Sequence, residues 1–148
     1  MTPEQILLRL RRFLLVLSAV HLGGTVAELW MVEHTEDPVQ FVPFVLCGLG
    51  ALAAVAVLLR PRRATVWALR ASAGLLVAGS LLGGYLHVEG NAALQREINP
   101  GAAGMDAVMG ALGGPNPLLA PGVLAIAGVI ALAATYRHPA LSPARPVA

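Results

Sequence analysis

The stretch that decides the fold runs from Phe13 to Val32 and reads FLLVLSAVHLGGTVAELWMV. Its only ionisable side chains are those of His21 and Glu28. A helix that crosses the hydrocarbon core of a bilayer needs about 20 mostly apolar residues. The stretch therefore predicts a membrane-spanning helix and not a surface helix of a soluble domain.

Three further stretches have the same apolar character, at residues 41–59, 67–88 and 118–136. Pro43 and Pro121 fall in the first turns of the second and the fourth stretch, where a missing N–H costs little. The sequence thus predicts an all-α integral membrane four-helix bundle, with residues 1–148 forming a single membrane domain.

The composition agrees with a bilayer location. The chain is 57% hydrophobic and 12% charged, whereas a soluble domain is about 25% charged and 45–50% apolar. A disordered chain has the opposite bias, so this class is also excluded. Cys47 is the only cysteine, which excludes an internal disulfide framework and a thiolate metal cluster.

The arginines predict the orientation of the spans. All ten basic residues are arginine. The predicted spans place nine of them on one side: Arg9, Arg11, Arg12, Arg60, Arg62, Arg63, Arg70, Arg137 and Arg145. Only Arg96 falls on the other side. Because basic residues mark the cytoplasmic side, we expect a multi-pass protein of the bacterial inner membrane with both termini in the cytoplasm. Topology accounts for the positive charge, so we expect lipid and not nucleic acid as the partner.

The N-terminal stretch also fits a second interpretation. The basic segment before Phe13, the apolar core up to Leu22 and the small residues around Ala27 resemble a cleaved signal peptide. The apolar run continues past this point to Val32, which favours a retained span. Cleavage would leave three spans and would remove His21.

The connections between the spans differ in length. Residues 33–40 and 60–66 are short links, which predict antiparallel neighbours. The outer loop 89–117 is long enough to contain structure of its own. Its apolar segment Met105–Leu112, flanked by glycines, predicts a short helix in the membrane interface. The proline-containing tail 139–148 is predicted to be a disordered cytoplasmic end.

Two stripes of polar residues lie within the predicted spans. The first consists of Ser18, His21, Thr25 and Glu28. The second consists of Ser80, Gly84, His87 and Asn91. Their spacing of three and four residues places each stripe on one helix face. Buried carboxyls and imidazoles are costly in lipid, so we expect the two stripes to face each other in the bundle. Ser18, His21, Thr25 and Asn91 are the candidates for a polar relay.

Acids and histidines gather at the predicted outer surface. The candidate metal ligands are Glu28, His34, His87 and Glu89. Imidazole and carboxylate together suit a divalent ion such as Zn, Mn or Fe. The other interpretation is that His34 and its acidic neighbours form a solvated turn before Pro38. A bis-histidine haem is disfavoured, because His21 and His87 differ in height by roughly 15 Å.

Three functions follow from these patterns. The first is a small inner-membrane protein whose outer His/Glu cluster binds a divalent metal. The second is a non-catalytic accessory or interaction subunit, in a homodimer or a larger membrane complex. The third is a small transporter or proton-relay component, although the polar ladder has no continuation through the inner half. Nucleotide-binding and triad motifs are absent from the sequence, so enzymatic activity and catalytic residues are left open.

Three segments carry a resemblance to a known group. These are Tyr85–Asn91 (YLHVEGN), Leu119–Gly122 (LAPG) and Thr135–Pro139 (TYRHP). The chain resembles a group of small uncharacterised bacterial four-span membrane proteins. The resemblance implies a bacterial membrane location and no particular chemistry.

Overall fold

The computed structural model describes residues 1–142, and these residues contain helices and no strands. The α-helices are α1 (Pro3–Met31), α2 (Val42–Leu59), α3 (Arg63–Ile98), α4 (Met105–Leu112) and α5 (Gly122–Ala134). Two short 3-10 helices are η1 (Pro38–Phe41) and η2 (Pro139–Leu141). By length and composition, three segments are able to cross a membrane: Pro3–Met31, Pro38–Leu59 and Arg63–Ile98.

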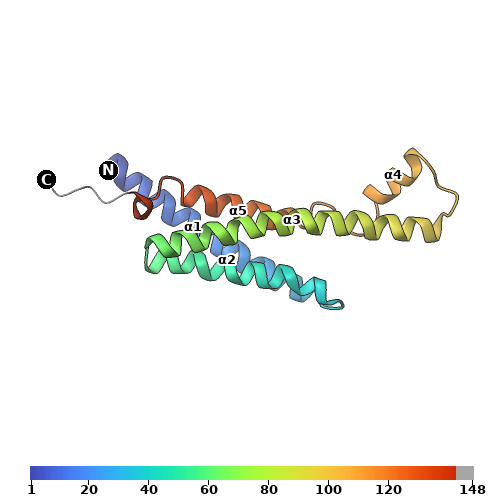
Figure 1. Ribbon diagram of the computed structural model, residues 1–148, viewed down its shortest axis with the longest axis horizontal. Coiled ribbons are helices and arrows are strands. Elements are labelled where there is room, and N and C mark those ends of the chain that lie inside the picture. The colour runs from blue at the N-terminus through green and yellow to red at the C-terminus, as the bar shows by residue number, and fades with distance from the viewer. Residues whose placement is uncertain (143–148) are drawn as a thin grey trace.

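Four of the helices, α1, α2, α3 and α5, lie side by side (Figure 1). α2 and α5 each pack against both α1 and α3, while the backbones of α1 and α3 do not approach each other closely. Glycines permit the close approaches. A Cβ on Gly50 would lie 2.9 Å from Leu22 Cδ1 and 3.0 Å from Leu76 Cδ1. A Cβ on Gly79 would collide with Leu46, so this glycine serves packing within the chain.

These contacts define levels along the bundle. Leu22 of α1 and Leu76 of α3 meet at Gly50 and therefore share a level. α1 and α3 run in the same direction, so equal numbers of residues from this level lead to equal heights. Met31 is therefore level with Tyr85 at one end of the bundle, and Arg12 is level with Val66 at the other. At about 1.5 Å rise per residue, α1 climbs roughly 28 Å between Arg12 and Met31. This length matches a hydrocarbon core of about 30 Å.

The third helix is longer than the predicted span 67–88. α3 has 36 residues and continues through the first part of the predicted loop 89–117 as far as Ile98. The reason is local, since residues 92–97 are helix formers and the next proline is Pro100. The prediction that the helix ends at residue 88 was therefore wrong, whereas the short helix Met105–Leu112 is confirmed.

The last helix is shorter than the predicted span 118–136. α5 has 13 residues, from Gly122 to Ala134, because the helix starts after Pro121 and ends in a turn after Thr135. Beyond it, Pro139–Leu141 form a 3-10 turn, where the sequence predicted disorder. The rest of the predicted tail, residues 143–148, lies outside the described residues.

Candidate functional site

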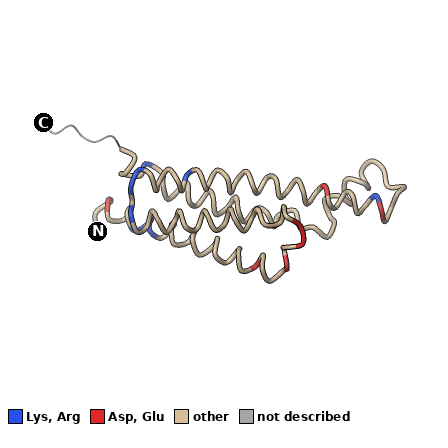
Figure 2. Tube along the Cα trace, turned by 60° about the horizontal axis from the view of Figure 1, so that its bottom comes forward, with Lys and Arg blue, Asp and Glu red and all other residues tan. Residues whose placement is uncertain are grey.

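The two ends of the bundle differ in charge. Figure 2 shows the arginines gathered at the end where the chain begins, while most acids lie at the other end or beyond it. We call these the arginine end and the acidic end. Three features determine what the two ends are able to bind: the polar stripe of α1, the helix α4 with the end of α3, and the arginines around the end of α5.

The polar stripe of α1 faces α5. Ser18 Oγ donates a hydrogen bond to the carbonyl of Ala127 at 3.4 Å, and His21 Nε2 lies 3.1 Å from the carbonyl of Val123. Thr25 Oγ1 donates to the carbonyl of His21, one turn earlier on α1, at 3.0 Å. The predicted pairing of this stripe with α3 was wrong, because α1 and α3 occupy opposite corners of the bundle. The bonds of Ser18 and His21 cross-link α1 to α5, and the relay role stays a prediction.

Glu28 is exposed, so the prediction that it faces the bundle interior was wrong. The cause is helical drift. At 3.6 residues per turn, Glu28 lies about 80° around the helix from Ser18. Glu28 is also one turn from the end of α1 at Met31, where a carboxylate reaches the interfacial water.

His34 lies in the loop after α1, and His87 lies on α3. Burial lowers the pKa of His34, and the nearby charge of His87 lowers it further. His87 Nδ1 lies 2.8 Å from the carbonyl of Pro117. Because a carbonyl only accepts, Nδ1 of His87 is the donor in this bond.

The structure brings together only part of the predicted metal site. Glu28 and Glu89 are exposed, and within residues 1–142 no group of three or more His, Cys, Asp or Glu side chains is placed to hold a metal ion. Among the four candidate ligands, only His34 and His87 are linked, through the effect of His87 on the pKa of His34.

Asn91 has a structural role that its place in the predicted relay did not suggest. Its side chain is 1% exposed. Oδ1 accepts from the backbone N–H of Asn116 at 2.8 Å, and Nδ2 donates to the carbonyl of Asn116 at 3.0 Å. Asn91 therefore ties α3 to the segment before α5, away from Ser18, His21 and Thr25.

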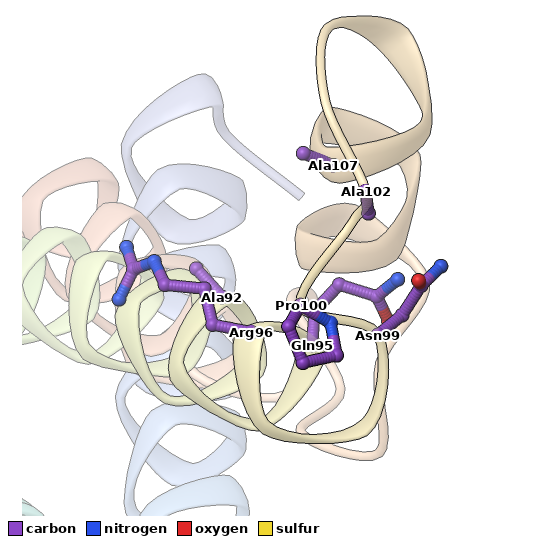
Figure 3. A pocket seen from close by; sticks show the side chains of 7 residues that line it. All are labelled: Ala92, Gln95, Arg96, Asn99, Pro100, Ala102 and Ala107. Atoms are coloured by element: carbon purple, nitrogen blue, oxygen red, sulfur yellow. The ribbon is translucent and has the colours of Figure 1, made fainter.

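The end of α3 and the helix α4 form a unit that we call the outer hairpin (residues 88–98 and Met105–Leu112). It extends beyond the ends of the other helices (Figure 1). α4 packs on α3 through small residues, since a Cβ on Gly110 would meet the side chain of Gln95 at 2.5 Å. A crevice of about 110 Å³ lies between the two helices (Figure 3). Arg96 points away from α4 in this view.

The larger apolar side chains of α4 point outward. Met105, Val108, Met109 and Leu112 are 71%, 50%, 59% and 49% exposed. Their spacing of three and four residues places them on one helix face, which we call the α4 stripe. The arrangement is the reverse of a helix that packs by its large side chains, because the small residues face α3.

Arginines close the end of α5 at the arginine end. Arg11 is 8% exposed, and its Nη2 donates to the carbonyls of Tyr136 at 3.2 Å and Arg137 at 2.9 Å. Arg70 donates from Nε to Thr135 Oγ1 and from Nη2 to the Thr135 carbonyl, both at 3.3 Å. These donors satisfy carbonyls of the turn that follows α5 and so fix the chain at the end of this helix.

The orientation of the spans explains why Arg11 lies at this end of the bundle, but it does not explain why its side chain is buried. The buried residues of α1 are Arg11, Leu15, Ser18, Leu22 and Thr25. Their spacing of four and three residues is the signal in the sequence that places Arg11 on the buried face.

His138 completes this end. Its Nδ1 accepts a hydrogen bond from the backbone N–H of Ala140 at 3.2 Å. Burial lowers the pKa of His138, and the positive charges of Arg11 and Arg70 lower it further. The imidazole is thus held neutral, which its acceptor role requires.

Comparisons with protein-family models, with curated proteins and with solved structures found no match to this chain. The resemblance to small bacterial four-span proteins accordingly stays a prediction. The functional argument rests on the geometry of the two ends.

Proposed function

We propose that this chain is a four-span inner-membrane protein that acts as a non-catalytic accessory subunit, with both termini in the cytoplasm. The heights at which α5 and its flanking turns contact α3 support a fourth membrane span. A Cβ on Gly83 would lie 2.9 Å from Pro121, and Arg70 is bonded to Thr135. α5 and its flanking turns therefore run beside α3 through most of the hydrocarbon depth. The arginine end faces the cytoplasm by the positive-inside rule.

The outer hairpin is the feature that supports an interaction role. Tyr85 lies level with the outer end of α1, and α3 climbs roughly 20 Å further to Ile98. α4 packs alongside this extension, with Gly114 against Asn91 and Gly110 against Gln95. The α4 stripe thus lies outside the hydrocarbon core, where lipid tails do not cover it. Exposed apolar patches of this kind mark protein interaction sites.

The charge around the α4 stripe indicates the chemistry of the partner. The acidic end and the outer hairpin carry seven acids: Glu28, Glu33, Glu36, Asp37, Glu89, Glu97 and Asp106. Arg96 is the one basic residue there. A complementary surface has an apolar patch with a basic rim.

The size of the α4 stripe indicates how the partner is held. A standard interface buries about 800 Å² of surface on each partner. One eight-residue helix offers a smaller area than this. A partner anchored in the same membrane overcomes this limit, because anchoring raises its effective concentration. We therefore assign the α4 stripe to the outer domain of another membrane protein.

Photo-crosslinking in intact membranes tests this function. A photoreactive residue at Met109 is compared with one at Ala93, an exposed position on α3 in the same hairpin. We expect an adduct with one other membrane protein from Met109 only, and we expect salt to weaken it. The double substitution Met109→Gln and Leu112→Gln removes the complex, while Ala93→Gln leaves it intact. A lack of any adduct, or an adduct of twice the chain mass alone, contradicts the proposal.

A divalent metal site at His34 and His87 is the second candidate. The observation in its favour is the bond from His87 Nδ1 to the Pro117 carbonyl, since metal-bound histidines commonly donate their other ring N–H in this way. Further ligands would come from water or from a partner. Elemental analysis of the purified protein, with His87→Ala as the control, tests this candidate. Negligible Zn, Mn and Fe in both proteins would exclude it.

A further inference from the structure

A second binding site is suggested by the surroundings of Arg70. Its guanidinium Cζ lies 5.4 Å from the centroid of the Trp67 ring, within the range of a cation–π contact. Its hydrogen bonds to Thr135 use Nε and Nη2. Within residues 1–142, these contacts fix the guanidinium in place and leave Nη1 for another acceptor.

The depth of Arg70 favours a counter-charge beside its guanidinium. Arg70 lies one turn above Val66, which is roughly 6 Å inside the hydrocarbon boundary. Charged groups at this depth are found with a partner of opposite charge or with polar groups. Glu4 is the only acid at the arginine end, near the start of α1. An anion that pairs with the remaining N–H groups of Arg70 would therefore come from outside the chain.

One face of α3 is shaped for an amphiphilic anion. Arg63, Trp67, Arg70 and Gly74 are spaced by four, three and four residues and lie on one face. Trp67 is 52% exposed. No side chain approaches Gly74, because a Cβ placed there would meet nothing within 4 Å. The face thus has two cations and an indole at the interface, and a shallow apolar track above them.

We propose that this face of α3 binds an anionic phospholipid of the cytoplasmic leaflet, with its phosphate between Arg63 and Arg70 and one acyl chain along Gly74. A guanidinium is suited to phosphate because its N–H groups match two oxygens at once. The Trp67 ring holds the Arg70 guanidinium from one side. This site is independent of the partner assigned to the outer hairpin.

Lipid titration of the full chain by native mass spectrometry in detergent tests the site. Phosphatidylglycerol is the probe, and zwitterionic phosphatidylcholine is the comparison. We expect Arg63→Gln to weaken binding of the first phosphatidylglycerol about tenfold, because it removes a charge-assisted hydrogen bond to the phosphate. Trp67→Leu is expected to weaken it about two- to fivefold. Arg60→Gln is the matched control and is expected to change it less than about twofold.

A second measurement distinguishes a specific site from a diffuse charge effect. In a Trp30→Phe background, Trp67 is the only tryptophan. Brominated phosphatidylglycerol is expected to quench Trp67 more strongly than brominated phosphatidylcholine. Equal weakening by Arg60→Gln and Arg63→Gln, or equal quenching by the two lipids, overturns the proposal. Displacement of the lipid by inorganic phosphate at the same concentration also overturns it, because the ligand would then be a free phosphate.

Discussion

Replacing Asn91 with alanine is expected to release the outer hairpin. The Asn91 side chain makes two hydrogen bonds to the backbone of Asn116, at 2.8 and 3.0 Å, and is 1% exposed. Each bond contributes about 0.5–1.5 kcal/mol, and an unsatisfied buried donor costs about 1–3 kcal/mol. The two bonds and the unsatisfied donor together lower the free energy of local opening by about 2–6 kcal/mol. At 1.4 kcal/mol for each factor of ten, opening becomes at least about 30-fold more frequent.

Hydrogen–deuterium exchange measures this opening directly. We expect the amides of residues 105–116 to exchange at least about 30-fold faster in Asn91→Ala. The spans are expected to keep their rates, because the lost bonds lie outside them. The control is Asn99→Ala, since Asn99 is exposed at the end of α3. If Asn91→Ala exchanges within about twofold of the unchanged chain, the role assigned to this side chain is wrong.

Three further predictions concern the bundle and its arginine end. Arg11→Gln is expected to lower the unfolding temperature in detergent, because it removes hydrogen bonds to the end of α5, while Arg12→Gln at an exposed position has little effect. Gly79→Leu is expected to destabilise the chain by about 1–3 kcal/mol through overpacking, whereas Gly74→Leu is tolerated because its surroundings are open. Equal shifts of the unfolding temperature in the two variants would contradict this contrast. The pKa of His138 is lowered, so the turn at residues 135–141 is expected to be ordered above about pH 6.5 and to loosen as the pH falls through the lowered pKa. Hydrogen–deuterium exchange rates in this turn that do not change with pH, after correction for the intrinsic rate, would argue against this prediction.

The helices themselves follow from local properties of the chain. Apolar length predicts the three long helices, and glycine breakers predict the bounds of α4, because both signals act within a few residues. The part of α3 after Val88 was missed for the opposite reason. A change from apolar to polar residues marks the end of a span, but a helix continues until a breaker such as Pro100.

The candidate sites depend on which faces meet, and a periodic pattern does not specify the partner of a face. The spacing of Ser18 and His21 correctly indicates a polar face, but either α3 or α5 satisfies it equally well. The effect of His87 on the pKa of His34 likewise joins a loop to a distant helix.

By itself, the amino-acid sequence determined the helical class, the apolar segments and the separation of arginines from acids. These properties depend on residue type and on neighbours in the chain. Only the tertiary structure decided that α1 pairs with α5, that Glu28 is exposed and that Arg11 is buried. It also decided that α4 turns its large side chains outward. The physical reason is that each of these features is a contact, or the lack of one, between segments far apart in the chain.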